Sequence, residues 1–247
     1  MWALVLPLLL LPALQPLPDT AALFAATRAN LSRAGRVQNQ FAYKERRTQL
    51  HLNPFGRLGT GGTIVYEMTP TADGYSRRVL EEDGKPVAGA EPEIVRRRRG
   101  RDDAPSPSPL SDVIASIILT VDRRDALDGR PAIVVKFQPN PGASPKTREG
   151  RLARSFRGEI WIDETAQEVA RIDAVAVDSI SYGFGLVARL GAGTKVTVRR
   201  EPQGDVWLPV SVRFTGEGRA LLLRKLNIDM AIDWYDYQRA SGAGRPQ

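Results

Sequence analysis

Residues 225–234 read KLNIDMAIDW, and this stretch decides the fold class of the chain. Apolar side chains at every second position alternate with polar or small ones along it. Because side chains of a β-strand point alternately to the two faces of a sheet, this period of two predicts a strand with one apolar face. Residues 206–214, VWLPVSVRF, repeat the pattern. Long, one-sided strands joined by short turns predict a strongly curved antiparallel sheet with an apolar concave face.

Strand patterns of this kind fill most of the chain. They follow one another from residue 156 to residue 237, and further strands are expected between residues 37 and 82. The dipeptides Asp83-Gly84 and Asp128-Gly129 match the tight turns of β-hairpins. We therefore predict a mainly β (α+β) fold, an unclosed and strongly curved antiparallel β-barrel or half-barrel.

One helix is expected before the strands. Asp19 or Thr20 can cap a helix that begins at Ala21, and Gly35 is expected to end it. An apolar concave face needs a cover, which can be a helix, a second sheet or a ligand. We expect this N-terminal helix and short lid elements to lie over the face.

The domain organisation follows from length and composition. The 247 residues suit one β domain, which we place at residues 19–238, with a disordered tail at residues 239–247. At about residues 89–109 the chain is rich in arginine, proline and serine, a composition that cannot bury a core. This segment is predicted to be a mobile, basic insertion within the domain.

The first residues of the chain resemble a leader. Residues 1–14 are almost wholly apolar, but they are too few to span a membrane as a helix. Their length matches the apolar core of a secretory signal peptide, which we place at residues 1–18. A buried N-terminal helix is the alternative, and Pro7 and Pro12 argue against it. We expect an exported protein of the periplasm or cell envelope, without a lipid anchor because the chain has no cysteine to acylate.

Few residues suit catalysis or metal binding. The absence of cysteine excludes disulfides and thiolate sites, and the single histidine, His51, excludes a two-histidine metal site. The glycines of residues 59–62 precede a strand pattern, whereas a phosphate-binding loop precedes a helix. The glycines of residues 183–193 indicate either bends of a curved sheet or an apolar flap. We expect no cofactor and no metal, and we expect that the protein is not an enzyme.

The charge balance bears on the partners. A net charge of +7 favours anionic membrane surfaces or nucleic acid, although an arginine-rich background composition also explains it. The arginines of residues 96–101 lack the interleaved aromatic residues that single-strand binders use for stacking. We therefore expect no nucleic acid partner, and basic loops that touch anionic headgroups.

Arg77 and Arg78 are adjacent in a predicted strand, so one of them must point to the concave side. An inward arginine is costly unless it is paired or binds a ligand. The alternative is that the inward residue lies at the edge of the sheet, in water.

Four segments carry a resemblance to a known family. They are residues 126–142 (ALDGRPAIVVKFQPNPG), 157–174 (RGEIWIDETAQEVARIDA), 181–196 (SYGFGLVARLGAGTKV) and 205–214 (DVWLPVSVRF). With the leader, the helix and the interrupted sheet, they resemble uncharacterised exported bacterial members of the outer-membrane lipoprotein-sorting superfamily. That superfamily includes a periplasmic lipoprotein carrier, its outer-membrane receptor and stress-sensing regulators. The resemblance covers roughly residues 21–238.

The resemblance implies an unclosed barrel with helices as a lid over an apolar cavity for acyl chains. In the carrier an arginine after the second strand helps to hold the lid and the ligand, and Arg77 is the nearest counterpart here. The expected function is a non-enzymatic carrier of lipid or acylated protein, in lipoprotein sorting or envelope lipid handling, with a possible membrane protein partner. An envelope-stress sensor of the same fold is the alternative, and a hydrolase that uses carboxylates is the least favoured. The candidates for lining the cavity are Phe41, Tyr43, Ile64, Tyr66, Leu208, Val210, Val212, Ile228, Met230 and Ile232.

Overall fold

The structure is a computed structural model of the whole chain. It describes residues 16–52, 58–72, 74–96, 109–182, 188–220 and 224–240. The helices are α1 (Thr20–Val37), the 3-10 turn η2 (Gln38–Gln40), α2 (Pro109–Ala115) and α3 (Arg148–Ala153). The strands of the first half are β1 (Phe41–Leu52), β2 (Leu58–Thr71), β3 (Gly74–Glu82), β4 (Lys85–Pro86), β5 (Glu93–Arg96), β6 (Ile117–Leu127) and β7 (Arg130–Pro139). Those of the second half are β8 (Phe156–Asp163), β9 (Glu168–Ala176), β10 (Ile180–Tyr182), β11 (Ala188–Leu190), β12 (Lys195–Gln203), β13 (Val206–Ala220) and β14 (Arg224–Arg239).

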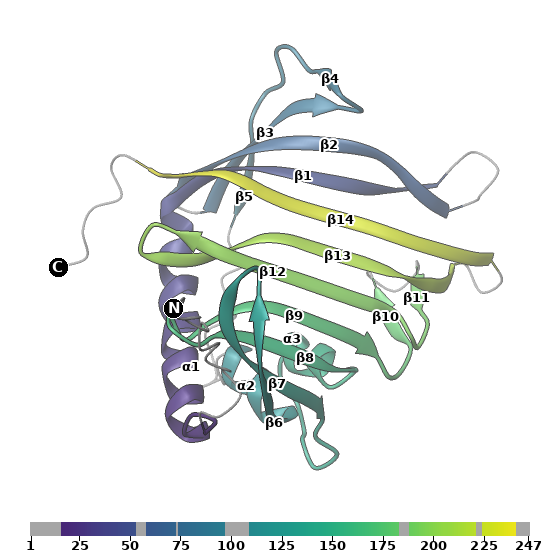
Figure 1. Cartoon of the computed structure of the whole chain (residues 1–247). Coiled ribbons are helices and arrows are strands. Elements are labelled where there is room, and N and C mark those ends of the chain that lie inside the picture. Colours follow the sequence, from purple (N-terminus) through teal and green to yellow (C-terminus); the bar gives the residue numbers. More distant parts are fainter. Residues whose placement is uncertain are drawn as a thin grey trace, which may run out of the picture.

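All fourteen strands of the described residues belong to one antiparallel sheet (Figure 1). Its order is β4-β3-β2-β1-β14-β13-β12-β9-β8-β7-β6, with β5 beside β3 and the β10–β11 pair attached to β13. The path begins at β4 and ends at β6 without closing on itself. The predicted fold class, a mainly β and unclosed antiparallel sheet with an N-terminal helix, is therefore confirmed.

Two hairpin turns have the backbone that their sequences predict. Asp83 and Gly84 both have positive φ, at 50° and 75°, and Asp128 and Gly129 have φ of 51° and 78°. Asp tolerates this left-handed region and Gly adopts it at no steric cost, which is why Asp-Gly fits two-residue hairpins.

Helix α1 begins as predicted but ends later. The Asp19 carboxylate accepts a hydrogen bond of 2.7 Å from the Ala22 backbone N–H and caps the helix. The prediction that Gly35 ends the helix was wrong, because the helix continues to Val37. Val37 packs against the buried side chains of Phe41 and Leu208, and this packing outweighs the weak helix propensity of one glycine.

The predicted insertion contains one strand. Residues 93–96 form β5, which pairs with β3 and which the sequence did not indicate. Arg77 and Glu93 form an ion pair of 2.5 Å across the two strands. Residues 97–108, the apolar residues 1–15 and the tail after residue 240 lie outside the described residues. Within the described residues, no helix combines the length and the apolar character needed to cross a membrane.

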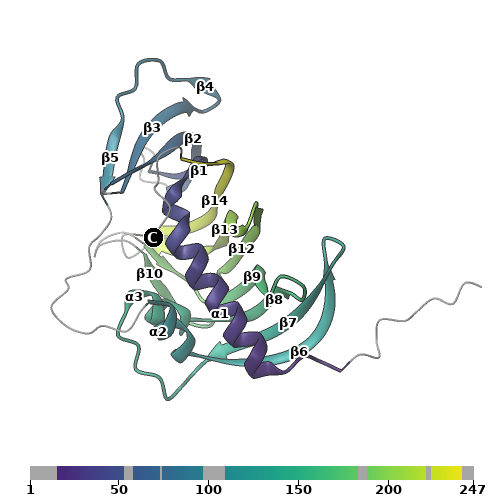
Figure 2. The same cartoon turned by 90° about the vertical axis from the view of Figure 1, so that its left-hand side faces the viewer.

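Helix α1 lies across one face of the sheet, which we call the inner face (Figure 2). Near its start, Leu23 and Phe24 pack on apolar side chains of β6, β7 and β8. At its end, Val37 reaches Phe41 of β1 and Leu208 of β13. The helix thus holds together strands from both halves of the sheet.

Candidate functional site

The structure places four of the predicted cavity residues in packed clusters. Phe41 and Leu208 are buried together with Val206, beside the end of α1. Tyr43 and Tyr66 are buried together on neighbouring strands β1 and β2. All four side chains therefore belong to packed clusters of the core.

The other candidates lie further along the inner face or beside it. Val212 stands opposite Ile232 in the β13–β14 pairing, and both side chains are half-buried. Ile64, Val210 and Met230 are half-buried as well. Val210 is the extra residue at an irregularity between β12 and β13. Ile228 pairs with Gly216, and its side chain lies outside the described part of the chain.

The half-buried residues form a continuous surface, which we call the apolar strip. One row runs Val198–Val212–Ile232 across β12, β13 and β14, and the next row runs Val196–Phe214–Met230. All six side chains are half-buried. A half-buried apolar surface on the side of the sheet that α1 covers can receive further apolar atoms.

A polar group adjoins the strip on β1. Glu45 stands opposite Trp234 and Tyr66, and Arg47 stands opposite Ile232 and Ile64, so both charged residues share the inner face with apolar ones. The Glu45 side chain is only 4% exposed. Its carboxylate accepts a 2.8 Å hydrogen bond from the Trp234 indole N–H and a charged one from Arg47.

Sequence reasoning did not single out Glu45 and Arg47. The signal was present, because alternation from Phe41 and Tyr43 continues to both residues. The charged run that contains them obscures this period.

Of the two adjacent arginines in β3, Arg77 is the inward one. It stands opposite Met68, and its guanidinium lies 5.0 Å from the centroid of the Tyr66 ring. Arg78 pairs instead with Glu67. The Arg77 side chain is 25% exposed, and its hydrogen bond to Glu93 raises the pKa of the guanidinium although burial opposes this.

A second guanidinium lies near the same ring. The Arg47 guanidinium is 5.6 Å from the centroid of the Tyr66 ring. Tyr66 is therefore close to two positive groups on the inner face. Ile64 lies in the same strand as Tyr66, and Arg47 stands opposite both Ile64 and Ile232. This juxtaposition places positive charge beside an apolar surface.

A buried ion pair fixes α1 to the sheet. Arg200 donates to Glu168 at 3.1 Å, and Arg33 of α1 lies 3.8 Å from the same carboxylate. Burial raises the pKa of Glu168 and lowers that of Arg200, although each group favours the charged form of the other. Asn30 of α1 donates to two backbone carbonyls of the β8–β9 turn. These contacts hold the helix over the inner face.

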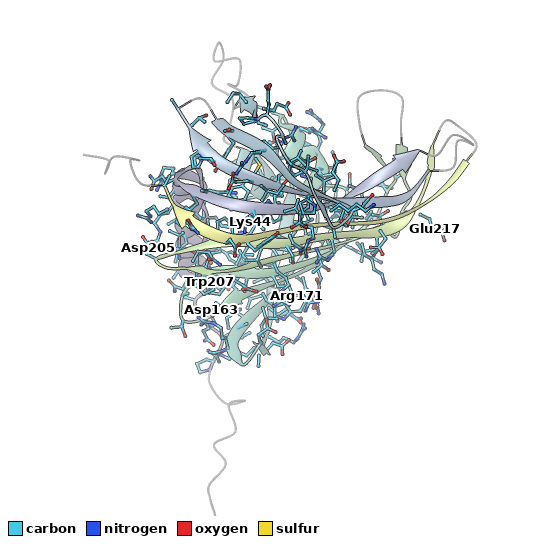
Figure 3. All side chains as sticks on the ribbon, turned by 90° about the horizontal axis from the view of Figure 1, so that it is seen from above. Lys44, Asp163, Arg171, Asp205, Trp207 and Glu217 are labelled. Atoms are coloured by element: carbon cyan, nitrogen blue, oxygen red, sulfur yellow. The ribbon has the colours of Figure 1, made fainter. Side chains whose placement is uncertain are left out.

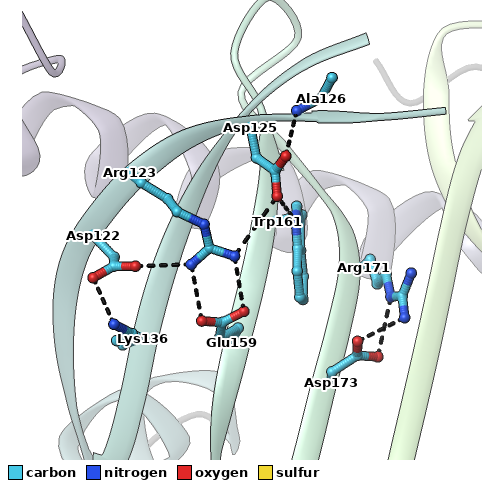
Figure 4. A network of polar contacts seen from close by, with 9 residues as sticks. All are labelled: Asp122, Arg123, Asp125, Ala126, Lys136, Glu159, Trp161, Arg171 and Asp173. Carbon is cyan, nitrogen blue, oxygen red and sulfur yellow. Dashed lines mark hydrogen bonds and ion pairs between the residues drawn. The ribbon is translucent and has the colours of Figure 1, made fainter. Parts of the chain in front are cut away.

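The opposite, outer face is strongly polar (Figure 4). Arg123 bonds Glu159 through two nitrogens, at 2.9 and 3.2 Å, and also Asp122. The Trp161 indole donates to Asp125, and Arg171 stacks on the Trp161 ring at 5.2 Å. The outer face thus offers paired charges, whereas the inner face offers apolar surface.

A pocket of about 340 Å³ opens among β7, β9, β12 and β13. Arg130, ion-paired with Asp163, stacks over Trp207 on its wall. Figure 3 shows Trp207, Asp163 and Arg171 on one side of the sheet. No sequence signal indicates this pocket, because its walls combine residues between 127 and 170 with residues between 199 and 207, which are far apart along the chain.

Side chains that hold a metal ion occur in groups of several ligands. No group of three or more histidine, aspartate or glutamate side chains suited to a metal ion occurs among the residues that the structure describes. The side chain of His51 lies outside them.

No protein-family model matches the sequence, and no curated protein matches it. Among solved structures, a DUF1329 family protein from Desulfovibrio piger shares 15% identity over 89% of this chain and 95% of its own, with a TM-score of 0.32. A LolA superfamily protein from Nitrosomonas europaea shares 13% identity over 87% and 94%, also with a TM-score of 0.32. An outer membrane lipoprotein-sorting protein domain from Vibrio parahaemolyticus shares 10% identity over 88% and 95%, with a TM-score of 0.33. The names of the second and third of these structures refer to the superfamily that the sequence motifs resemble.

Proposed function

We propose that the protein is a non-enzymatic carrier that binds the acyl chains of a lipid or an acylated protein on the inner face of its sheet. The observation that supports this most is the apolar strip, two rows of three half-buried side chains on adjacent strands. An extended acyl chain can lie along such rows and be removed from water without any catalytic group.

The expected binding energy is sufficient for a carrier. Each buried methylene contributes about 0.8 kcal/mol, so about ten of them contribute about 8 kcal/mol before the cost of ordering the ligand is subtracted. Micromolar affinity needs about 8 kcal/mol after a cost of about 4 kcal/mol or more has been subtracted. About fifteen buried methylenes supply this, so a buried acyl chain gives reversible binding of the kind that a carrier requires.

The polar group next to the strip suits the other end of such a ligand. Arg77 and Arg47 flank Tyr66 on the inner face, close to Ile64 and Ile232. A guanidinium near an apolar surface pairs well with a phosphate or a carboxylate. We therefore assign Arg77 a role in holding the ligand headgroup. The apolar leader supports export, and with it a place in envelope lipid handling and contact with a membrane protein.

A fluorescent fatty acid tests the proposal, together with native mass spectrometry of the purified protein. Met230→Gln makes the strip polar, whereas Ala231→Gln makes the same kind of change at the next residue of the strand. We expect Met230→Gln to weaken binding of the probe about fivefold or more and Ala231→Gln to leave it unchanged.

The opposite result would be equally clear. A protein that carries no lipid and ignores the probe has a filled inner face, and the interaction module that senses envelope stress would then replace the carrier. Equal loss of binding in both variants would place the probe elsewhere on the molecule.

A further inference from the structure

Most positive charges on the sheet have a negative partner within it. Arg124 pairs with Glu164, for example, and Arg199 pairs with Asp128, both at 2.7 Å. Further pairs join Lys44 to Asp236, Arg78 to Glu67, Lys136 to Asp122, Arg171 to Asp173, Arg213 to Asp233 and Arg239 to Asp205. Several other cations of the described part form no ion pair and lie outside these strands.

One place is the connection from β7 to β8, which contains α3. Lys146, Arg148, Arg151 and Arg154 lie here with a single acidic residue, Glu149. The ion pairs among the described residues include none of these four cations. Arg151 and Arg154 donate instead to backbone carbonyls of the same connection, at 3.0 Å each.

An apolar side chain stands in the middle of these cations. Leu152 is 46% exposed, between Arg151 and Arg154 in the sequence. We call Lys146, Arg148, Arg151, Leu152 and Arg154 the α3 patch. An exposed leucine among cations gains little in water, but at a bilayer surface the leucine enters the acyl boundary while the cations stay with the headgroups.

Hydrogen bonds to α2 fix the backbone at the start of the α3 patch. The buried carboxylate of Asp112, in α2, accepts bonds from the Lys146 and Thr147 backbone N–H groups and from the Thr147 hydroxyl. A side chain at Gly150 would meet this carboxylate at 2.2 Å, so the first turn of α3 lies directly against it. The patch is therefore presented in one arrangement, which lowers the entropy that docking costs.

The location of the patch suits delivery of a lipid. Helices α2 and α3 lie on the same side of the sheet as α1 (Figure 2). Phe156, two residues beyond Arg154, is buried with Phe137 in the core of the inner face. The cationic surface thus adjoins the face on which we place the acyl chains.

We propose that the α3 patch docks the protein onto the surface of a bilayer that contains anionic phospholipid, with Leu152 in the interface. This inference rests on the proposed function, because the docked surface would supply or receive the carried acyl chain. An acidic protein or a nucleic acid would pair with the cations but would give Leu152 no apolar surroundings.

Vesicle sedimentation tests the proposal, with vesicles of phosphatidylcholine alone or with about 30% phosphatidylglycerol. The double variant Lys146→Glu/Arg148→Glu reverses two charges whose side chains make no bond within the patch. Lys85→Glu/Lys195→Glu is the matched control, since both lysines are exposed and lie on other parts of the sheet. A third variant, Leu152→Ser, removes the apolar contact and keeps every charge.

We expect binding to the anionic vesicles only, about tenfold weaker in the first variant and unchanged in the control. Leu152→Ser should lower the affinity that survives in about 0.5 M salt, where charge attraction is screened. Equal weakening in the control, tighter binding to polyglutamate or single-stranded DNA than to vesicles, or no vesicle binding would each overturn the proposal. Fatty-acid binding without vesicles should be the same in all variants, so failure of docking and failure of the carrier function are distinguishable.

Discussion

Glu45 shows how one carboxylate can organise a polar group within an apolar surface. It accepts from the Trp234 indole and from Arg47, and it is almost fully buried. Without it, the indole N–H and the guanidinium would face the inner surface unpaired, which costs more than the pair itself contributes. The two aromatic rings nearby, Tyr66 and Trp234, would then lose their fixed positions.

Glu45→Ala should therefore lower the free energy of unfolding by about 2 kcal/mol, measured by urea denaturation at neutral pH. Glu67→Ala removes a similar arginine partner from the neighbouring strand, but there the ion pair with Arg78 is exposed. Its expected cost is below about 1 kcal/mol. Equal costs for the two changes would contradict the burial argument.

Energy transfer from tryptophan offers a second measurement at the residue scale. Trp234 contacts the inner aromatic cluster, whereas Trp161 belongs to the polar network of the outer face. Trp234→Phe should remove most of the energy transfer to a bound fluorescent fatty acid, and Trp161→Phe should remove less of it. The reverse order would place the ligand on the outer face.

At the scale of elements, β8 and β9 approach each other closely at Gly158. A Cβ atom there would lie 1.9 Å from the backbone oxygen of Asp173, so any side chain must push the two strands apart. The same two strands carry the contacts of α1 through the β8–β9 turn. A local change at this glycine therefore reaches the helix that covers the inner face.

Gly158→Ala is expected to destabilise the protein by about 3 kcal/mol, which a shift of the urea midpoint would report. Gly142→Ala is the control, because its new methyl group would meet only the Asn140 side chain at 3.6 Å. Similar midpoints for the two variants would show that β8 and β9 adjust without cost.

The hydrogen bonds between α2 and the start of α3 depend on the charge of the Asp112 carboxylate. The hydroxyl of Thr147, its backbone N–H and that of Lys146 hold the pKa of Asp112 below its ordinary value of 3.8. Because the pKa of Asp112 is lower in the folded state, its charge contributes its full stabilisation when the pH is above the ordinary pKa. This stabilisation is lost as the pH falls through the pKa of the folded state.

Asp112→Asn should accordingly be less stable than the original protein at pH 7, and the difference should shrink as the pH falls below about 4. Urea midpoints at pH 7 and pH 3 measure it. Asp205→Asn, at an exposed ion pair with Arg239, should show little difference at either pH. A constant difference for Asp112→Asn between the two pH values would contradict the role of its charge.

The elements show what the sequence can predict and what it cannot. Alternation located most strands of the second half, and the Asp-Gly dipeptides located two hairpin turns, because both signals are local. Gly35 as a stop signal placed the end of α1 too early, since the packing of Val37 on the cluster of Phe41 and Leu208 joins residues distant in sequence. Strand β5 was missed for the same reason, as its pairing with β3 and the Arg77–Glu93 contact are tertiary. The apolar strip followed from the period of two, but which candidates are packed and which half-buried depends on where α1 lies.

At the scale of the whole molecule, the two faces of the sheet differ in polarity. Charged pairs cover much of the outer face, and the inner face combines a packed core with the apolar strip. Most charges on the described strands form ion pairs, whereas the cations of the α3 patch do not. The positive charge of the described part is therefore concentrated on one side of the molecule. The proposed docking of the α3 patch would therefore hold the molecule in one orientation on a membrane.

The pairing of β1 with β14 also constrains the order of folding. Phe41 stands opposite Arg239, so nearly the whole chain separates two neighbouring strands. Synthesis from the N-terminus delivers β1, β2 and β3 long before β14, and contacts of such long range form slowly. During that interval β1 has one open edge, which invites pairing with other chains. Newly synthesised copies should therefore need a holding factor until residue 239 has emerged, and shortening the chain before β14 should turn a folding protein into an aggregating one.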